Sequence, residues 1–260
     1  MTIDPSATQL NLTEVIEDMF LVLTNKEKEV IVQRFSLDNR PRRTLESIGQ
    51  HFSVTRERIR QIEKIALGKL RRTVQTTKIN LINEIADNVI TENGGVLLET
   101  KMISAILNFI RSSEDVDANI ICLASSINGN IEKVDKTNLY SPFWRLKALD
   151  FDLIVAVINA GIKVLKKKGD VVSDSKLIVQ VRQLMGEKLE NLPDAMITSA
   201  LEADKRIKRM EGAFGLMSWR HLNPSIMRDK AYIVLKSENC PLHVVEISNK
   251  IAVAGFDKKV

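Results

Sequence analysis

The side chains best suited to chemistry in this chain lie between residues 54 and 64, and they suit the recognition of nucleic acid. Arg56, Glu57, Arg60, Gln61 and Lys64 are spaced i, i+1, i+4, i+5 and i+8, which places them on one face of an α-helix. Arginine pairs bidentately with guanine O6 and N7, glutamine suits adenine, and glutamate accepts from cytosine N4. The pattern therefore predicts a helix that reads base edges in the DNA major groove.

A solvated charged helix face is the alternative explanation of the same pattern. Pairs spaced i,i+4 would have to support it, yet Arg56–Arg60 and Arg60–Lys64 are like-charged and repel each other. The segment from Arg40 to Arg72 also holds ten Lys/Arg and three Glu, a local excess larger than the +5 of the whole chain. Such a concentration of positive charge is typical of a phosphate-binding surface, so the pattern favours DNA contact.

Two short helices must position this face. We expect the first at residues 44–52 and the second at residues 56–71, with Gly49 allowing a close approach between them. Such a helix-turn-helix places its second helix in the major groove. Before it, Thr24 and Glu27 form a capping box for a helix, and residues 36–43 are expected to form a loop. The expected core residues are Leu45, Ile48, Phe52, Val54, Ile59, Ile62, Ala66 and Leu70.

The remainder of the chain holds an internal repeat with a period of 75 residues, which aligns Gly94 with Gly169 and Trp144 with Trp219. Each copy is expected to contain a helix that ends at the glycine, a short extended segment, two helices and a hairpin before the tryptophan. The hairpins are predicted at residues 131–140 and 207–216. This order of elements is that of a winged-helix domain, and a partial third copy follows Trp219.

The charges of the two full copies argue against DNA reading by their third helices. The one near residues 117–127 has almost no charge, and the one near 194–205 includes Asp194, Glu202 and Asp204, so phosphate attraction would be weak. Protein contact or spacing is the favoured role. The basic wing at residues 205–209 leaves two alternatives open for the second copy, contact with a DNA backbone or a solvated wing. The lysines at 166–168 are expected to form a solvated helix end, favoured by the helix dipole.

Residues 23–71 resemble region four of the sigma-70 family of bacterial sigma factors, and the string 54–63 resembles that of its primary members. The resemblance implies recognition of a promoter −35 element. It also implies that the helices within residues 12–35 dock on the flap of the RNA polymerase β subunit. By the same resemblance Arg56, Glu57 and Gln61 read bases. The residues that hold phosphates or support the site are Thr44, Thr55, Arg58, Arg60 and Arg71.

The partial third copy resembles the HARE-HTH winged helix, found in the delta subunit of bacterial RNA polymerase and beside some restriction enzymes. The residues that carry this resemblance are 231–235 and 241–247. His243 has no neighbouring ligand cluster, so we expect a structural role for it. The sequence stops where a third helix and wing would follow, which suggests a fragment or an incomplete unit.

Two departures from sigma factors shape the functional expectation. Region four is C-terminal in that family and N-terminal here, and no counterpart of the regions that melt the −10 element is found. We therefore expect a sequence-specific DNA-binding protein of bacterial transcription with double-stranded DNA as partner, rather than a chain that opens promoters alone. The alternatives are the DNA-targeting module of a restriction, modification or defence system with catalysis elsewhere, and a protein-interaction scaffold.

Composition sets the remaining expectations. The 260 residues are 44% hydrophobic and 5% aromatic, and only two cysteines occur. Cys122 and Cys240 lie far apart in apolar settings and are expected to be buried thiols. No catalytic motif, metal site, cofactor site, signal sequence or membrane span is found in the sequence, so we expect a cytoplasmic protein that is not an enzyme.

The predicted fold class is mainly α, with a helix-turn-helix domain followed by tandem winged-helix domains with small β-hairpin wings. The predicted segments are a disordered tail at 1–11, the helix-turn-helix domain at 12–75, repeats at 79–147 and 151–222, and the partial unit at 226–260.

Overall fold

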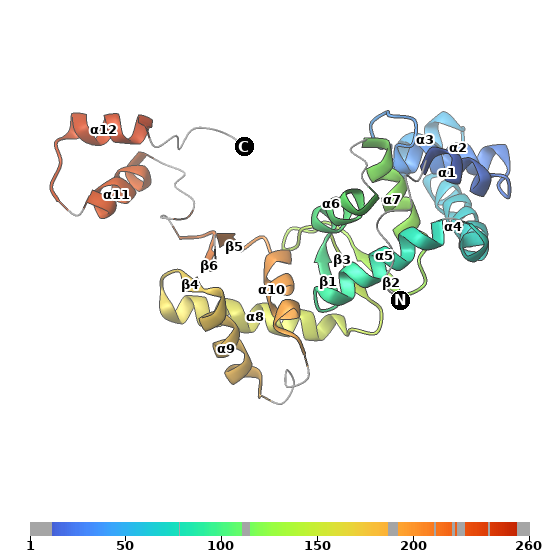
Figure 1. The fold of residues 1–260 in the computed structure, drawn as a ribbon. Helices are drawn as coiled ribbons and strands as arrows, with labels where there is room; N and C mark the ends of the chain where they lie inside the picture. The colour runs from blue at the N-terminus through green and yellow to red at the C-terminus, as the bar shows by residue number, and fades with distance from the viewer. Residues whose placement is uncertain are drawn as a thin grey trace. The chain divides into compact units, whose positions relative to one another are not determined.

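The structure, a computed structural model, describes residues 12–77, 79–110, 115–186, 192–210, 212–219, 222, 227–238 and 240–253 (Figure 1). They fall into two compact units, one running from the first helix to the third strand and the other from the eighth helix onward. These described residues are mainly helical with two small antiparallel sheets, as the sequence predicts. The predicted tail at 1–11 lies outside the described residues.

The first four helices form the predicted helix-turn-helix domain. They are α1 (Leu12–Phe20), α2 (Asn25–Phe35), α3 (Leu45–His51) and α4 (Arg56–Thr73), followed by a 3-10 turn, η1 (Val74–Thr76). The predicted capping box is confirmed, because the Thr24 amide donates to Glu27 Oε2 at 2.8 Å and the Glu27 amide donates to Thr24 Oγ1 at 3.4 Å. This exchange satisfies two amides that the start of α2 would otherwise leave unpaired.

The core of the domain contains the predicted residues. Ile48, Ile59, Ala66 and Leu70 are fully buried and Ile62 nearly so, while the three remaining predicted residues, Leu45, Phe52 and Val54, are partly buried against this core. The close approach expected at Gly49 is also present, because a Cβ added there would lie 2.7 Å from the Val54 carbonyl oxygen. The two helices of the motif can therefore reach their observed separation only with glycine at this position.

The first repeat has the order of elements of a winged helix. It consists of α5 (Ile79–Glu92), β1 (Val96–Leu98), α6 (Glu99–Ile110), α7 (Asp115–Ile127), β2 (Ile131–Val134) and β3 (Phe143–Leu146). The strands form one antiparallel sheet in the order β1-β3-β2. Gly94 has a φ of 78°, which a left-handed residue after a helix requires.

The second repeat has the same topology. Its elements are α8 (Phe151–Lys168), β4 (Val172–Ser173), α9 (Asp174–Met185), α10 (Asp194–Ala203), β5 (Ile207–Met210) and β6 (Ala213–Leu216), with the sheet order β4-β6-β5. Gly169 has a φ of 71°. A further helix pair, α11 (Met227–Glu238) and α12 (Val244–Val253), packs together where the partial third copy is predicted.

The predicted alignment of Trp144 with Trp219 is wrong. Trp144 belongs to β3 and lies two residues before Leu146, which pairs with Ile131. In the second repeat Leu216 pairs with Ile207, so Phe214 takes the place of Trp144. Trp219 lies beyond β6. A constant period fails here because the segment between the wing strands is longer in the first repeat than in the second.

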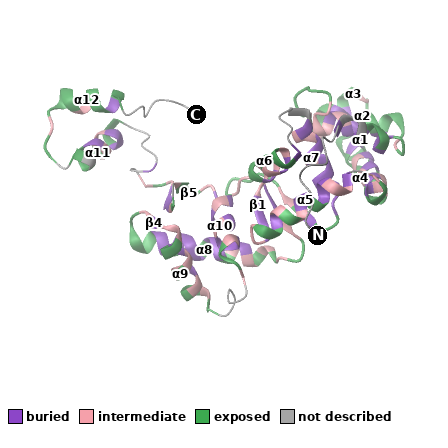
Figure 2. Cartoon of the chain, in the orientation of Figure 1, coloured by how far each residue is buried: buried purple, intermediate pink, exposed green. Residues whose placement is uncertain are grey.

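Helix α7 joins the first repeat to the helix-turn-helix domain. It contacts α1, α2 and α4, and each of the four helices contributes buried apolar residues to one continuous core, so α7 is largely purple in Figure 2. Arg71 donates from Nε to the carbonyl oxygen of Ile127 and from Nη2 to that of Ser126, both at 3.2 Å. The segments predicted at 12–75 and 79–147 are therefore packed into one unit.

Two further predictions concern burial and membranes. Cys122 is partly buried, but Cys240, which lies between α11 and α12, is exposed, so the prediction of two buried thiols is wrong for Cys240. Among the helices that the structure describes, none is both long enough and apolar enough to span a bilayer.

Candidate nucleic-acid interface

The first half of α4 has the two-sided character that the sequence predicts. Ile59 and Ile62 point into the core and are buried. The exposed side carries the six predicted DNA-facing side chains Arg56, Glu57, Arg58, Arg60, Gln61 and Lys64. This face therefore combines base-reading groups with phosphate-binding cations on one rigid helix.

Thr55 and Thr44 begin the two helices of the motif. Thr55 Oγ1 accepts from the Arg58 amide at 3.2 Å, and Thr44 Oγ1 accepts from the Ser47 amide at 3.1 Å. Both threonines therefore act as N-caps, a supporting role within the set that the resemblance assigns. The cap fixes the first turn of α4, where the helix dipole adds partial positive charge beside Arg56.

Several groups on the exposed face already have partners. Glu57 accepts two hydrogen bonds from Arg60, from Nη2 at 2.7 Å and from Nε at 2.8 Å. These bonds lower the pKa of Glu57 and raise that of Arg60. Arg58 Nη1 donates to Gln61 Oε1 at 3.2 Å. The solvated-face alternative is therefore partly realised, through i,i+3 pairs rather than the i,i+4 pairs considered from the sequence.

Arg56 and Lys64 differ in their partners from the other charged side chains of this face. In the part of the chain that the structure describes, neither makes a hydrogen bond or an ion pair, and both are exposed. Arg56 feels the charge of Glu57 nearby, but neither cation has a hydrogen bond or ion pair that must be broken before it binds a phosphate or a base edge. These two residues are the strongest candidates for direct DNA contact.

Arg71 lies apart from this face. It is 15 residues from Arg56, which on an α-helix is about 22 Å along the axis. Its guanidinium holds the last carbonyls of α7, Ser126 and Ile127, as described above. The structure thus brings eight of the nine predicted residues to the beginnings of α3 and α4, and places Arg71 at the junction with the first repeat.

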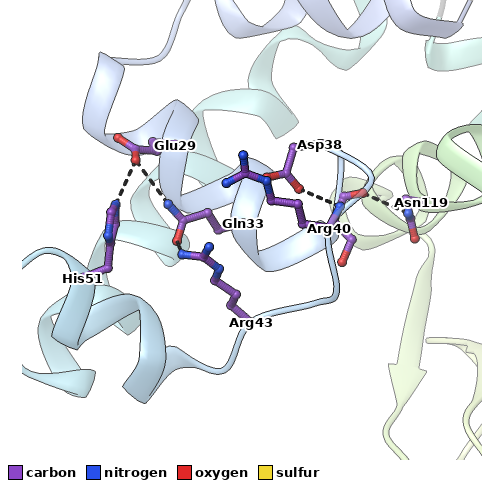
Figure 3. Close-up of polar contacts among 8 residues, drawn as sticks. Glu29, Gln33, Asp38, Arg40, Arg43, His51 and Asn119 are labelled. Atoms are coloured by element: carbon purple, nitrogen blue, oxygen red, sulfur yellow. Dashed lines mark hydrogen bonds and ion pairs between the residues drawn. The ribbon is translucent and has the colours of Figure 1, made fainter.

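The loop between α2 and α3 adds basic residues that the predicted site omitted. Arg43 donates from Nη1 to Gln33 Oε1 at 3.2 Å, and Gln33 in turn donates to Glu29, whose Oε1 also lies 3.2 Å from His51 Nε2 (Figure 3). These contacts fix the end of the loop just before Thr44. The signal for this loop was present in the sequence, because the charge excess begins at Arg40.

Arg40 is an exposed cation of this loop. Its side chain is 70% exposed, and its nearest carboxylate oxygen, on Asp38, is 3.7 Å away (Figure 3). At the other end of the loop, Asn119 Nδ2 donates to the Ser36 carbonyl oxygen at 3.0 Å. The loop is therefore anchored at both ends while Arg40 stays open to solvent, which suits a phosphate contact beside the helix-turn-helix.

The third helix of the first repeat is unavailable to DNA. Helix α7 buries Ile120, Ile121, Leu123, Ala124 and Ile127 in the core shared with the helix-turn-helix domain. Its low charge, noted from the sequence, therefore reflects a packing role.

The wings also use their cations internally. Lys133 pairs with Glu99 at 2.7 Å and lies over the Trp144 ring, with its Nζ 5.8 Å from the centroid. Arg209 repeats this arrangement with Asp174 at 2.6 Å and the Phe214 ring at 5.5 Å. In each repeat a wing cation thus joins the first residue of the second helix to an aromatic ring of the last strand.

The remaining wing arginine of the second repeat is paired as well. Arg206 meets the buried carboxylate of Asp204 at 2.6 Å, and Arg209 also meets Glu202 at 2.6 Å. The two arginines of the wing at 205–209 are thus neutralised by carboxylates of their own domain. Of the two alternatives for this wing, the pairing supports a structural role for its arginines.

Comparisons with known proteins agree with this placement of the interface. Residues 20–72 match the family model described as Sigma-70, region 4. The RNA polymerase sigma factor SigA of Bacillus sp and that of Listeria monocytogenes serovar 1/2a are each 47% identical over 76 residues. The match covers 29% of this chain and 20% of each relative, so the chain spans about a fifth of the length of these curated relatives.

No solved structure matches the chain significantly. Within the described ranges, no group of three or more His, Cys, Asp or Glu side chains is arranged to hold a metal ion. Residues 20–72 thus match sigma-70 region 4, which is a DNA-binding helix-turn-helix of the transcription machinery.

Proposed function

We propose that this chain is a sequence-specific DNA-binding protein of bacterial transcription that reads a −35-like element with α4. The single observation that carries the proposal is the exposed face at the start of this helix, where Arg56 makes no hydrogen bond or ion pair within the described residues and lies beside Glu57 and Gln61. The match of residues 20–72 to sigma-70 region 4 supports the same placement.

The paired groups on α4 suggest a division of roles. Arg56 reads a guanine edge directly, since it has no internal bond to break. Glu57 accepts from a cytosine amino group while its bonds to Arg60 hold that guanidinium toward the DNA backbone. Gln61 faces an adjacent base, and Lys64 and Arg58 bind phosphates. In this proposal the chain binds DNA in the cytoplasm and performs no catalysis.

RNA polymerase is a secondary partner in this proposal. The apolar residues of α1 and α2 that could meet the β flap are buried in the core shared with α7. The exposed apolar residues nearby are Leu21 and Val22, at 84% and 41% exposure, in the turn between these helices. We therefore assign any polymerase contact to this turn rather than to the buried faces of the helices.

A fluorescence anisotropy titration of the full chain tests the function. Two labelled duplexes are compared, one with a −35 element and one with the element scrambled. Arg56→Ala should reduce the discrimination between them by about 1–3 kcal/mol. Lys64→Ala should weaken both duplexes alike and lower the salt slope by about one.

The matched control is Lys176→Ala, which removes one exposed positive charge from α9. It should leave both titrations unchanged. If Arg56→Ala bound the two duplexes with the wild-type ratio of affinities, base reading by this face would be disproved.

A further inference from the structure

A groove of about 480 Å³ lies between α8 and α9 in the second repeat. Helix α8 contributes Lys163, Val164, Lys167 and Lys168, and α9 contributes Gln180, Gln183 and Leu184. Val164 is buried, whereas Leu184 is 47% exposed. We call this feature the lysine groove. Its volume falls within the range of sites that hold small molecules or peptide segments.

The lysine groove contains only positive charge. None of its lining residues is a carboxylate, and in the described part of the chain its three lysines have no ion-pair partner. The arginines of the same repeat do have such partners, as for Arg182 with Asp194 at 2.6 Å. Lys163 and Lys167 are one helical turn apart, and like charges at this spacing destabilise a helix. Three lysines of this repeat without an ion-pair partner therefore lie together at the groove.

Compensation of the helix dipole explains only part of this charge. Lysines in the last turn of α8 are favoured by the dipole, and Lys166 shares that benefit without lining the groove. Lys163 lies more than one turn before the end of the helix. The dipole therefore accounts poorly for Lys163, and it does not explain why Gln180 and Gln183 face the lysines.

The first repeat shows that the fold does not require these lysines. Helices α6 and α9 are related by the 75-residue period, since they begin at Glu99 and Asp174. At the same offset Lys163, Lys167 and Lys168 correspond to Asn88, Glu92 and Asn93 of the first repeat. The same pair of helices is thus built there with a neutral or acidic surface, which leaves the lysines of the second repeat open for a binding role.

We propose that the lysine groove binds an acidic amphipathic helix of a partner protein. Leu184, which lines the groove and is 47% exposed, provides the apolar contact for one side of such a helix, as in other helix-in-groove complexes. The three lysines meet its carboxylates, and the two glutamine amides complete the polar contacts. A DNA duplex fits less well, because it is far wider than this groove and gains nothing from the exposed leucine.

The test uses the full chain and a labelled synthetic peptide of 16 residues with Glu and Leu at helical spacing. A scrambled peptide of equal composition is the control ligand. We expect the amphipathic peptide to bind more tightly than the scrambled one. The double variant Lys163→Gln/Lys167→Gln should weaken this binding roughly three- to tenfold, as for two exposed ion pairs, and Leu184→Gln should weaken it as well.

The matched control is Lys166→Gln/Lys176→Gln, which removes the same charge from the same two helices outside the groove. It should change the affinity less than twofold. Equal losses in the two double variants, or equal affinity for the two peptides, would refute the proposal. So would a labelled duplex or single strand that binds more tightly than the peptide and depends on Lys163 and Lys167 but not on Leu184. Because no step involves α4, the outcome is independent of −35 recognition.

Discussion

The close contact at Gly49 leads to a prediction about the geometry of the helix-turn-helix. In Gly49→Ala the new Cβ would lie 2.7 Å from the Val54 carbonyl oxygen and 3.4 Å from the Arg56 amide nitrogen. Both neighbours are backbone atoms of the turn and of the start of α4, so they cannot rotate away. Overpacking of this kind costs about 1–3 kcal/mol, while alanine gains only about 0.5–1 kcal/mol over glycine in a helix.

We therefore expect Gly49→Ala to lower the free energy of unfolding by about 0.5–2 kcal/mol, the difference between these effects. It should also weaken DNA binding, since α4 must shift relative to α3. Gly68→Ala is the matched control, because a Cβ there meets nothing within 4 Å. This second variant should stabilise the domain by about 0.5–1 kcal/mol.

Urea unfolding of the full chain measures both effects. In a Trp219→Phe background the fluorescence of Trp144 reports on the first unit alone, because Trp144 is buried in the core that this unit shares. Circular dichroism follows the whole chain. The reasoning would be refuted if Gly49→Ala were as stable as the wild type, or if Gly68→Ala lost as much stability as Gly49→Ala.

Three further predictions concern single side chains. Thr55→Val removes the N-cap of α4 and should lower the free energy of unfolding by about 1 kcal/mol in the same urea experiment; an unchanged midpoint would contradict the capping role. Arg71→Ala removes two hydrogen bonds to the end of α7 and should cost about 1–2 kcal/mol of stability, whereas a loss of DNA affinity without a loss of stability would indicate a phosphate contact instead. Burial, together with Glu99, raises the pKa of Cys122 to about 12. At pH 8 a thiol reagent should therefore modify exposed Cys240 quickly and Cys122 only after unfolding. If both thiols reacted quickly, Cys122 would be accessible and this prediction would be wrong.

The helix-turn-helix was predictable because its signals are local. A capping box, a glycine at a close approach and apolar residues at helical spacing each act within a few residues, and each is found where expected. The exposed face of α4 follows directly, since Ile59 and Ile62 fix which side is buried. The i,i+3 bonds from Arg60 to Glu57 could also have been predicted from the sequence, where only pairs spaced i,i+4 were considered.

The role of α7 was harder to predict from the sequence. An uncharged helix can be one that does not read DNA or one that is buried on several sides. Only its packing against other helices distinguishes these two explanations. Its contacts with α1 and α4 join segments more than forty residues apart in the chain, which no local pattern encodes. The paired wing arginines pose the same difficulty, because Asp174 meets Arg209 across 35 residues.

The core shared by α7 and the helix-turn-helix affects where this protein can be divided into domains, both in evolution and in engineering. A chain cut near residue 77, where the sequence invites a boundary, would leave the apolar sides of α1 and α4 open to water, and exposed apolar patches of this kind promote aggregation. The helix-turn-helix domain is therefore not expected to fold on its own. We expect it to be duplicated, transplanted or lost only together with its first repeat, and to unfold with that repeat in a single step.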